Sequence, residues 1–416
     1  MSEPTKKALV PMLRFPEFRD AGEWADAPLI ALAKFRRGSF PQPYGLPEWY
    51  DEENGMPFVQ VFDVGNNLRL KLKTKNKISK LGAEQSVFIA KGTLIITLQG
   101  SIGRVAITQY DAYIDRTLLI FEKFIKPTEK LFFAYVIQSL FEIEKEKAPG
   151  GIIKTITKES LSNFIVTLPS LSEQQKIADC LSSIDELVTA QTQKVEALKA
   201  HKKGLMQQLF PAEGETVPQL RFPEFRDSWK FKVLGQFLEG YSERVPSSTE
   251  LTIYSSTREG LKTQKDYYDG RELVNEGEYG VVPNGYFVYR HMSDDAVFKF
   301  NINSLENRIA VSKEYPVFKT KGLNAFFLLQ KLNNGLDFQE FAIIQKKGGT
   351  RTRLYFKTLC SWQTLLPTIQ EQQKIANCLS SIDDLISTQT QKLAALKAHK
   401  KGLMQQLFPA VDEVQP

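Results

Sequence analysis

Residues Pro169–Pro211 of this 416-residue chain return almost letter for letter as Pro367–Pro409. At an offset of 198 positions, 33 of the 43 aligned residues are identical. A second string, VPMLRFPEFRD at Val10–Asp20, returns as VPQLRFPEFRD at Val217–Asp227. The segments between these copies, roughly 21–168 and 228–366, share little. The chain is therefore one unit written twice, with a constant part and a variable part.

Both constant parts carry a heptad pattern, with seam positions spaced alternately four and three residues apart. In the first copy these positions are Ile177, Leu181, Ile184, Val188, Gln191, Val195, Leu198, Lys202, Leu205 and Leu209. The pattern predicts two helices of about 38 residues, or about 57 Å, that pair as a coiled coil. The polar seam residues recur at the same places in the second copy, as Gln389 and Lys400, and such residues can fix the register.

The outward-facing residues of the two predicted helices are duplicated as well, although a coiled coil constrains them little. Recent duplication alone does not explain this identity, because the variable segments have diverged almost beyond recognition. Gene conversion between the copies would explain it. Contact of both faces with two copies of one partner would also explain it, and we favour this second explanation.

The variable segments are typical of a mixed α/β fold. Stretches rich in β-branched and aromatic residues at 56–66, 86–107 and 113–124 predict strands, and 131–147 predicts a helix. The second segment repeats this layout, with a predicted helix at 323–332. Gly150-Gly151 and Gly348-Gly349 align at the offset of the helices. We expect boundaries at 1–168, 169–211, 212–366 and 367–416, with a pseudo-twofold internal repeat.

Composition argues for a binding protein. The net charge of +6 is compatible with a polyanionic partner, but it also fits an ordinary soluble protein. Three cysteines form no metal-binding or disulfide pattern, and no apolar run could span a membrane. We therefore expect a cytoplasmic chain. Only three histidines occur, and both a Walker loop and a methyltransferase-type Pro-Pro-Tyr motif are absent, so we expect no catalytic, cofactor or metal site.

The order of these segments resembles the DNA-specificity subunit of type I restriction–modification systems. LPSLSEQQKI and LPTIQEQQKI are similar to that family's domain-to-helix junction, and KGTLIITLQGSIGRVAI to a strand–turn–strand of its recognition domains. The resemblance covers about residues 10–409. It implies that each variable segment is a target recognition domain that reads one half of a split site in double-stranded DNA. It also implies that the paired helices space the half-sites and dock two methyltransferase subunits.

The resemblance further implies that restriction subunits join outside the methyltransferase subunits. S-adenosylmethionine, ATP and Mg would then be bound by the partner subunits. The chain itself would bind no cofactor and would not be an enzyme. Two rival readings stay open: a coiled-coil adaptor that presents two protein-binding domains, and a fused modification enzyme.

Base edges in the major groove are read mainly by Arg, Lys, Asn and Gln side chains. In the first domain the candidates are Arg36, Arg37, Gln60, Gln99, Ser101 and Arg104; in the second they are Ser255, Arg258, Arg290, Arg351 and Arg353. The string LRLKLKTKNK places Arg69, Lys71, Lys73, Lys75 and Lys77 at alternating positions, which predicts one face of an extended strand. These cations would contact phosphates, or they would protect a strand edge from aggregation.

Overall fold

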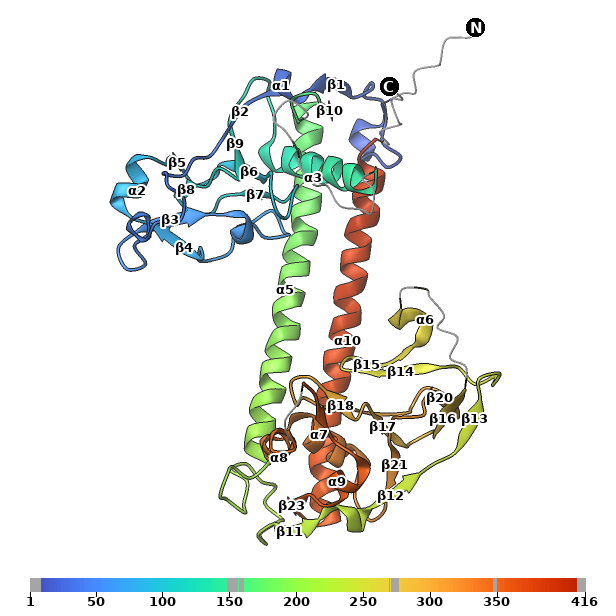
Figure 1. Ribbon diagram of the computed structural model, residues 1–416. Coiled ribbons are helices and arrows are strands. Elements are labelled where there is room, and N and C mark those ends of the chain that lie inside the picture. Colours follow the sequence, from blue (N-terminus) through green and yellow to red (C-terminus); the bar gives the residue numbers. More distant parts are fainter. Residues whose placement is uncertain are drawn as a thin grey trace. The chain divides into compact units, whose positions relative to one another are not determined.

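The computed structural model describes residues 9–147, 156, 161–268, 270, 277–346 and 350–409. The chain divides into two compact units, Met1–Thr192 with Lys392–Pro416, and Gln193–Gln391. Each unit holds one mixed α/β domain, the first half of one long helix and the second half of the other (Figure 1). Among the described residues, no helix is both long and apolar enough to cross a membrane.

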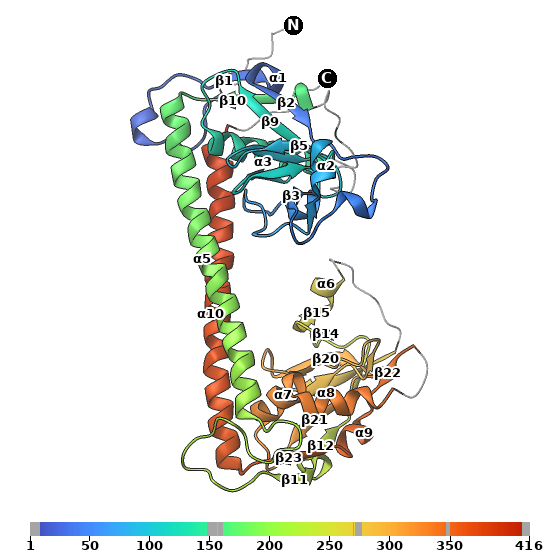
Figure 2. The ribbon, with the colours of Figure 1, turned by 90° about the vertical axis from the view of Figure 1, so that its left-hand side faces the viewer.

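The two long helices are α5 (Leu171–Leu209) and α10 (Ile369–Leu407). Every predicted seam position is buried or half-buried in both helices, which confirms the heptad pattern. In the first unit Asp185 of α5 contacts Lys400 of α10, and in the second Lys202 contacts Asp383. Within each unit the first half of one helix therefore runs antiparallel beside the second half of the other (Figure 2).

The first domain consists of short strands and one substantial helix. Its strands are β1 (Ala25–Pro28), β2 (Ala33–Arg37), β3 (Met56–Val59), β4 (Asn76–Ile78), β5 (Val87–Ile89), β6 (Leu94–Thr97), β7 (Val105–Ile107), β8 (Ala112–Ile114), β9 (Leu118–Phe124) and β10 (Ile165–Leu168). Its helices are α1 (Leu29–Leu32), α2 (Lys80–Glu84) and α3 (Lys130–Lys147).

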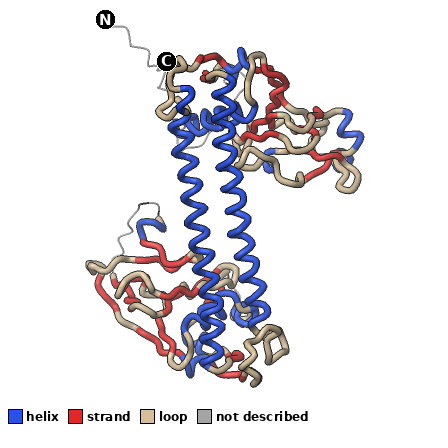
Figure 3. Tube along the Cα trace, turned by 180° about the vertical axis from the view of Figure 1, so that it is seen from behind, coloured by secondary structure: helices blue, strands red, loops and turns tan. Residues whose placement is uncertain are grey.

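The second domain has a comparable content of strands and helices (Figure 3). Its strands are β11 (Lys230–Val233), β12 (Leu238–Tyr241), β13 (Arg244–Pro246), β14 (Tyr254–Thr257), β15 (Gly260–Thr263), β16 (Glu278–Pro283), β17 (Phe287–Tyr289), β18 (Met292–Ser293), β19 (Phe300–Ile302), β20 (Arg308–Ser312), β21 (Val317–Thr320), β22 (Thr352–Arg353) and β23 (Gln363–Leu366). Its helices are α6 (Gln264–Tyr267), α7 (Ala325–Asn334), α8 (Leu336–Ile343) and α9 (Phe356–Cys360).

The two domains share one topology despite their different sequences. A four-stranded sheet has the order β2-β9-β6-β7 in the first domain and β12-β21-β17-β19 in the second, and every pairing in both is antiparallel. A second sheet pairs β3 parallel to β8 and β8 antiparallel to β5. Its counterpart has a parallel bridge from Ile253 to Ala310 of β20, which pairs antiparallel with β16.

A two-stranded antiparallel sheet lies where each domain joins the helices. β1 pairs with β10 directly before α5, and β11 pairs with β23 directly before α10. The cores then continue into the coiled coil: Ile177 and Leu407 belong to the first core, and Leu209 and Ile375 to the second. Burial of these apolar side chains fixes each domain on the helices.

The same ring cluster recurs at both junctions. Trp24 and Phe132 contact Phe408 in the first unit. Trp229 and Phe327 contact Phe210 in the second unit. Phe408 and Phe210 are repeat mates at the helix ends. The two tryptophans directly precede β1 and β11, and the other two rings lie on α3 and α7.

The extended strand predicted for the lysine-rich string is wrong. Only Asn76–Ile78 forms a strand, and 69–75 is a loop that begins after Leu68, whose φ is +58°. The alternation also fails in its burial, because Leu68 and Leu70 are buried while Leu72 is 97% exposed. The glycine pairs at 150–151 and 348–349 lie outside the described residues.

Candidate nucleic-acid interface

Two loops of the first domain surround a groove of about 590 Å³. One loop, residues 98–104, joins β6 to β7, and the other, residues 60–75, joins β3 to β4. The predicted candidates Lys71, Ser101 and Arg104 all line this groove. Residues that are distant in sequence therefore present two cations and a hydroxyl group to one surface.

Hydrogen bonds to the buried Thr97 hold the loop 98–104 in shape. The Thr97 hydroxyl group accepts the Arg104 N–H at 2.9 Å, and the Thr97 carbonyl accepts the Gly103 N–H at 3.0 Å. Gly103 has a φ of +82°, and a Cβ there would lie 2.5 Å from the ring of Phe141. Only glycine fits this turn. The Arg104 guanidinium donates to the Val64 carbonyl at 3.2 Å, which ties the two loops together.

Other first-domain candidates lie elsewhere. Gln60 is 6% exposed, and its amide donates to the Tyr44 hydroxyl group and accepts from Asn76, so it is occupied inside the domain. Arg36 on β2 forms a 2.6 Å ion pair with Glu122, and its neighbour Arg37 is exposed on the same strand. The remaining candidates are exposed but are not among the residues that line the groove: Arg69, Lys73 and Gln99.

The second domain has a groove of about 460 Å³ at the equivalent place. It lies between the turn from β14 to β15 and the loop 290–299 that joins β17 to β19. The predicted candidates Arg258 and Arg290 line it, together with Lys299. Burial and the nearby charge of Lys202 lower the pKa of Lys299. The candidate Ser255 lies on β14, whereas the next residue, Ser256, lines the groove.

Two carboxylates organise the arginines at this second groove. Asp295 pairs with Arg258, and Asp294 accepts from Arg351 Nε at 2.9 Å. Hydrogen bonds from Arg258 and then Ser293 hold the pKa of Asp295 well below its usual range. Arg353 is exposed on β22, which pairs with β18 in the same loop. Four of the five second-domain candidates therefore lie in or beside this loop or the turn from β14 to β15.

Sequence reasoning missed Lys299 and both carboxylates of the loop 290–299. Aligning β6 and β7 of the first domain with β17 and β19 of the second would have pointed to them, because the loop after β6 contributes Ser101 and Arg104 to the first groove. It also missed that the constant segments join each domain to both helices, although the duplication of VPxLRFPEFRD was the available signal.

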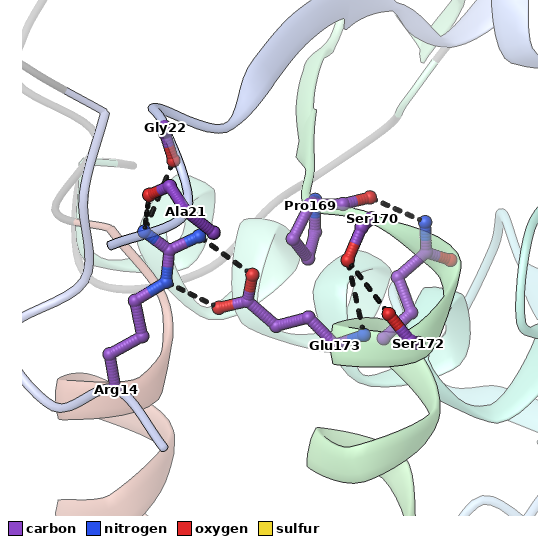
Figure 4. Close-up of polar contacts among 8 residues, drawn as sticks. Arg14, Ala21, Gly22, Pro169, Ser170, Ser172 and Glu173 are labelled. Carbon is purple, nitrogen blue, oxygen red and sulfur yellow. Dashed lines mark hydrogen bonds and ion pairs between the residues drawn. The ribbon is translucent and has the colours of Figure 1, made fainter. Parts of the chain in front are cut away.

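In the first unit, the repeated string Val10–Asp20 contacts the start of α5, as Figure 4 shows for Arg14 and Glu173. Arg14 donates to both carboxylate oxygens of Glu173 at 2.8 and 2.7 Å, while the Leu13 N–H donates to the Gln406 carbonyl of α10. Arg14 also donates to the carbonyls of Ala21 and Gly22. The string therefore links the start of one helix to the end of the other.

The second unit repeats these contacts with the repeat mates. Arg221 donates to both oxygens of Glu371 at 2.8 Å, and the Leu220 N–H donates to the Gln208 carbonyl of α5. Both carboxylates are 1% exposed. The hydrogen bond to its carboxylate partner raises the pKa of each arginine.

The aspartates that pair with the seam lysines also contact the domains. Lys400 contacts Asp185 at 2.6 Å, and the Tyr135 hydroxyl group of α3 donates to the same carboxylate at 2.7 Å. In the second unit Gln330 of α7 donates to Asp383, which also pairs with Lys202. Each of these aspartates thus has one partner on the other long helix and one in a domain. Within the described ranges, no group of three or more His, Cys, Asp or Glu could hold a metal ion.

Comparison with known proteins identifies related sequences. The family described as type I restriction modification DNA specificity domain matches residues 48–200 and 277–398. Two relatives come from Methanocaldococcus jannaschii. The putative type I restriction enzyme MjaX specificity subunit is 24% identical over 271 residues, which are 61% of this chain and 60% of that relative. The type I restriction enzyme MjaVIII specificity subunit is 22% identical over 345 residues, or 78% of this chain and 80% of that relative. The chain thus spans less than two thirds of the first relative.

Solved structures share the fold. The crystal structure of the type I restriction–modification S subunit from M. genitalium matches with a TM-score of 0.58 and 15% identity, covering 97% of this chain and 100% of that one. A chain from a structural study of assembly and conformational transition of the type I R-M system matches with a TM-score of 0.53 and 14% identity, covering 93% and 98%. With a family match over more than half of its residues, the chain belongs to the family of type I restriction–modification DNA specificity domains.

Proposed function

We propose that this chain is the DNA-specificity subunit of a type I restriction–modification complex. Each domain reads one half of a bipartite site in double-stranded DNA. The paired helices set the separation of the half-sites and dock two methyltransferase subunits, which restriction subunits join. The chain itself supplies no catalytic group, and S-adenosylmethionine, ATP and Mg act on the partner subunits.

One observation carries this proposal: the two domains place the same pair of loops around a groove at the same point of one shared topology. The side chains on these loops differ. The first groove presents Lys71 and Arg104 beside a serine, whereas Arg258, Arg290 and the carboxylate of Asp294 line the second. Arginine reads guanine bidentately and carboxylates accept from cytosine, so a common scaffold with different side chains suits two different half-sites.

Mapping of modified bases across the genome of cells that carry the chain and its partner genes tests this function. We expect two short specific blocks separated by a fixed number of unspecified bases. A single uninterrupted motif, or an unchanged pattern of modification after deletion of the chain, would refute the proposal.

Variants then assign the blocks to the domains. R104A should relax the first block alone and R290A the second alone, because each removes one cation from one groove. The matched control is K123A, which removes an exposed cation on β9. Loss of a bidentate base contact costs about 1–3 kcal/mol of discrimination, or roughly 5–150-fold.

A further inference from the structure

Leu72 is 97% exposed, the largest exposed fraction of any large hydrophobic side chain among the described residues. Its neighbours in the alternating string behave differently, since Leu68 and Leu70 are 4% and 7% exposed. Scattered exposed leucines are normal on protein surfaces. The surroundings of Leu72 are what distinguish it.

The loop is fixed on both sides of Leu72. The Lys71 N–H donates to the Asp63 carbonyl at 2.8 Å, and the Lys71 carbonyl accepts from the Tyr110 hydroxyl group at 2.9 Å. The Lys75 N–H donates to a carboxylate oxygen of Asp63 at 2.9 Å. Asp63 is fully buried. Leu72 therefore projects from a base that is held by the buried Asp63 and by Tyr110, not from the end of a loose segment.

The charge around Leu72 indicates the kind of partner. Residues 69–77 carry five cations and no acidic residue. Lys71 lines the groove that Arg104 and Ser101 share, and the Lys75 ammonium lies 5.0 Å from the ring centre of Phe62. An apolar tip with lysines on either side is complementary to duplex DNA, in which phosphates surround a stack of apolar base faces.

We propose that Leu72 is a wedge that inserts between two base pairs of the first half-site and bends the duplex. This role rests on the proposed function. Apolar side chains that enter a base step unstack it and kink the helix axis, while the adjacent lysines hold the phosphates on either side. In the second domain the tight turn from Thr257 to Gly260 replaces this loop. We therefore expect unstacking in the first half-site only.

A tryptophan placed at the tip reports directly on insertion. The four native tryptophans, Trp24, Trp49, Trp229 and Trp362, are each at most 5% exposed, so the L72W variant adds the one indole that iodide reaches readily. On addition of a duplex that carries the mapped site, we expect its emission to be quenched by base stacking and protected from iodide. The matched control is L81W on α2, where the leucine is 49% exposed.

The L72A variant tests the bend. Energy transfer between dyes at the two ends of the duplex should report a smaller bend, and Kd should rise about tenfold, or about 1.4 kcal/mol. L81A should change neither. A fluorescent adenine analogue placed along the site should lose its unstacking signal in the first half-site with L72A.

Several results would overturn the wedge. Selective binding by L72A with an unchanged bend would do so. So would an L72W emission that DNA leaves accessible to iodide, or one that a methyltransferase subunit protects without DNA. A wild-type chain with no sequence selectivity would instead refute the proposed function, so the two failures are distinguishable.

Discussion

Removal of the Glu371 carboxylate should destabilise the second unit strongly. Arg221 is 11% exposed and donates to both Glu371 oxygens at 2.8 Å, and the Trp229 indole donates to one of them at 3.2 Å. E371A removes all three acceptor contacts and leaves a nearly buried cation without its counter-charge. Breaking a buried pair in this way costs about 3–5 kcal/mol. E371Q keeps one acceptor oxygen, so it should cost less than E371A.

The repeat mate gives an internal comparison. Glu173 accepts the same pair of bonds from Arg14, but the Trp24 indole N–H has no hydrogen-bond partner among the described residues. E173A therefore breaks one hydrogen bond fewer than E371A. Since one such bond contributes about 1 kcal/mol, E173A should be the milder variant by about that amount.

Urea unfolding of the full chain, followed by tryptophan fluorescence, measures both losses. Hydrogen exchange of Leu220 and its neighbours assigns the loss to the second unit. The double variant R221M/E371A should recover part of the stability that E371A loses, because it removes the unpaired cation. A cost below about 1 kcal/mol for E371A, or a larger cost for E173A, would refute the reasoning.

Further variants test the spacing that the paired helices set, the first groove and the buried Lys331. Deletion of one matching heptad from α5 and α10 should shorten the unspecified spacer by roughly three base pairs and leave both half-sites unchanged, as modification mapping would show. G103A should lower the melting temperature and weaken DNA binding, because its Cβ would clash with Phe141. D337A should destabilise the chain in urea unfolding by leaving the buried Lys331 without its counter-charge, and K331M should cost less; because the Asp337 side chain is 44% exposed, the D337A loss should be smaller than that of E371A. Burial lowers the pKa of Lys331, and the charge of Asp337 offsets part of this effect. Without that carboxylate the folded chain releases the Lys331 proton at a lower pH than the unfolded chain does. The D337A loss should therefore shrink as pH rises toward the ordinary lysine pKa.

The sequence predicted the helices well because their signal is periodic and long. Ten apolar or polar seam positions at alternating steps of four and three residues fit only a long helix. Both helices begin within two residues of the expected bounds. The mixed α/β content of the domains also followed from local residue types, since α3 and α7 lie where apolar runs predicted helices. Periodicity identifies an element before its contacts are known.

The loops could not be predicted in this way, because distant partners decide their shape. Alternating leucines and lysines at 68–73 satisfy the pattern of a strand, yet Asp63 accepts backbone N–H groups of Lys71 and Lys75 and folds the segment into a loop. Gln60 has the side chain of a base reader, but Tyr44 and Asn76 occupy its amide. Hydrogen bonds between residues of variable segments leave no local signal in one sequence.

Contacts within the chain account for part of the sequence identity between the outward faces of the two long helices. Gln174 accepts the N–H of Glu129 at the start of α3, and Gln372 accepts that of Asn324 at the start of α7. Lys176 pairs with Glu17 of the other repeated string at 3.0 Å. Identity in the EQQK string therefore follows from contacts within the chain and is no evidence for two identical partners.

Exposed residues in the middle of each helix support the proposed docking of two methyltransferase subunits. Leu187 and Leu385 are repeat mates outside the seam and are 56% and 50% exposed. At this exposure the two leucines contribute little to packing within the chain. Their burial by two copies of one partner would explain why both are retained. The paired variant L187E/L385E should abolish copurification of the methyltransferase subunits and leave urea unfolding of the chain unchanged, because exposed substitutions change stability by about 0.5 kcal/mol or less. Single variants should each retain one subunit of the two. If the paired variant copurifies normally, the identity of these faces is better explained by gene conversion.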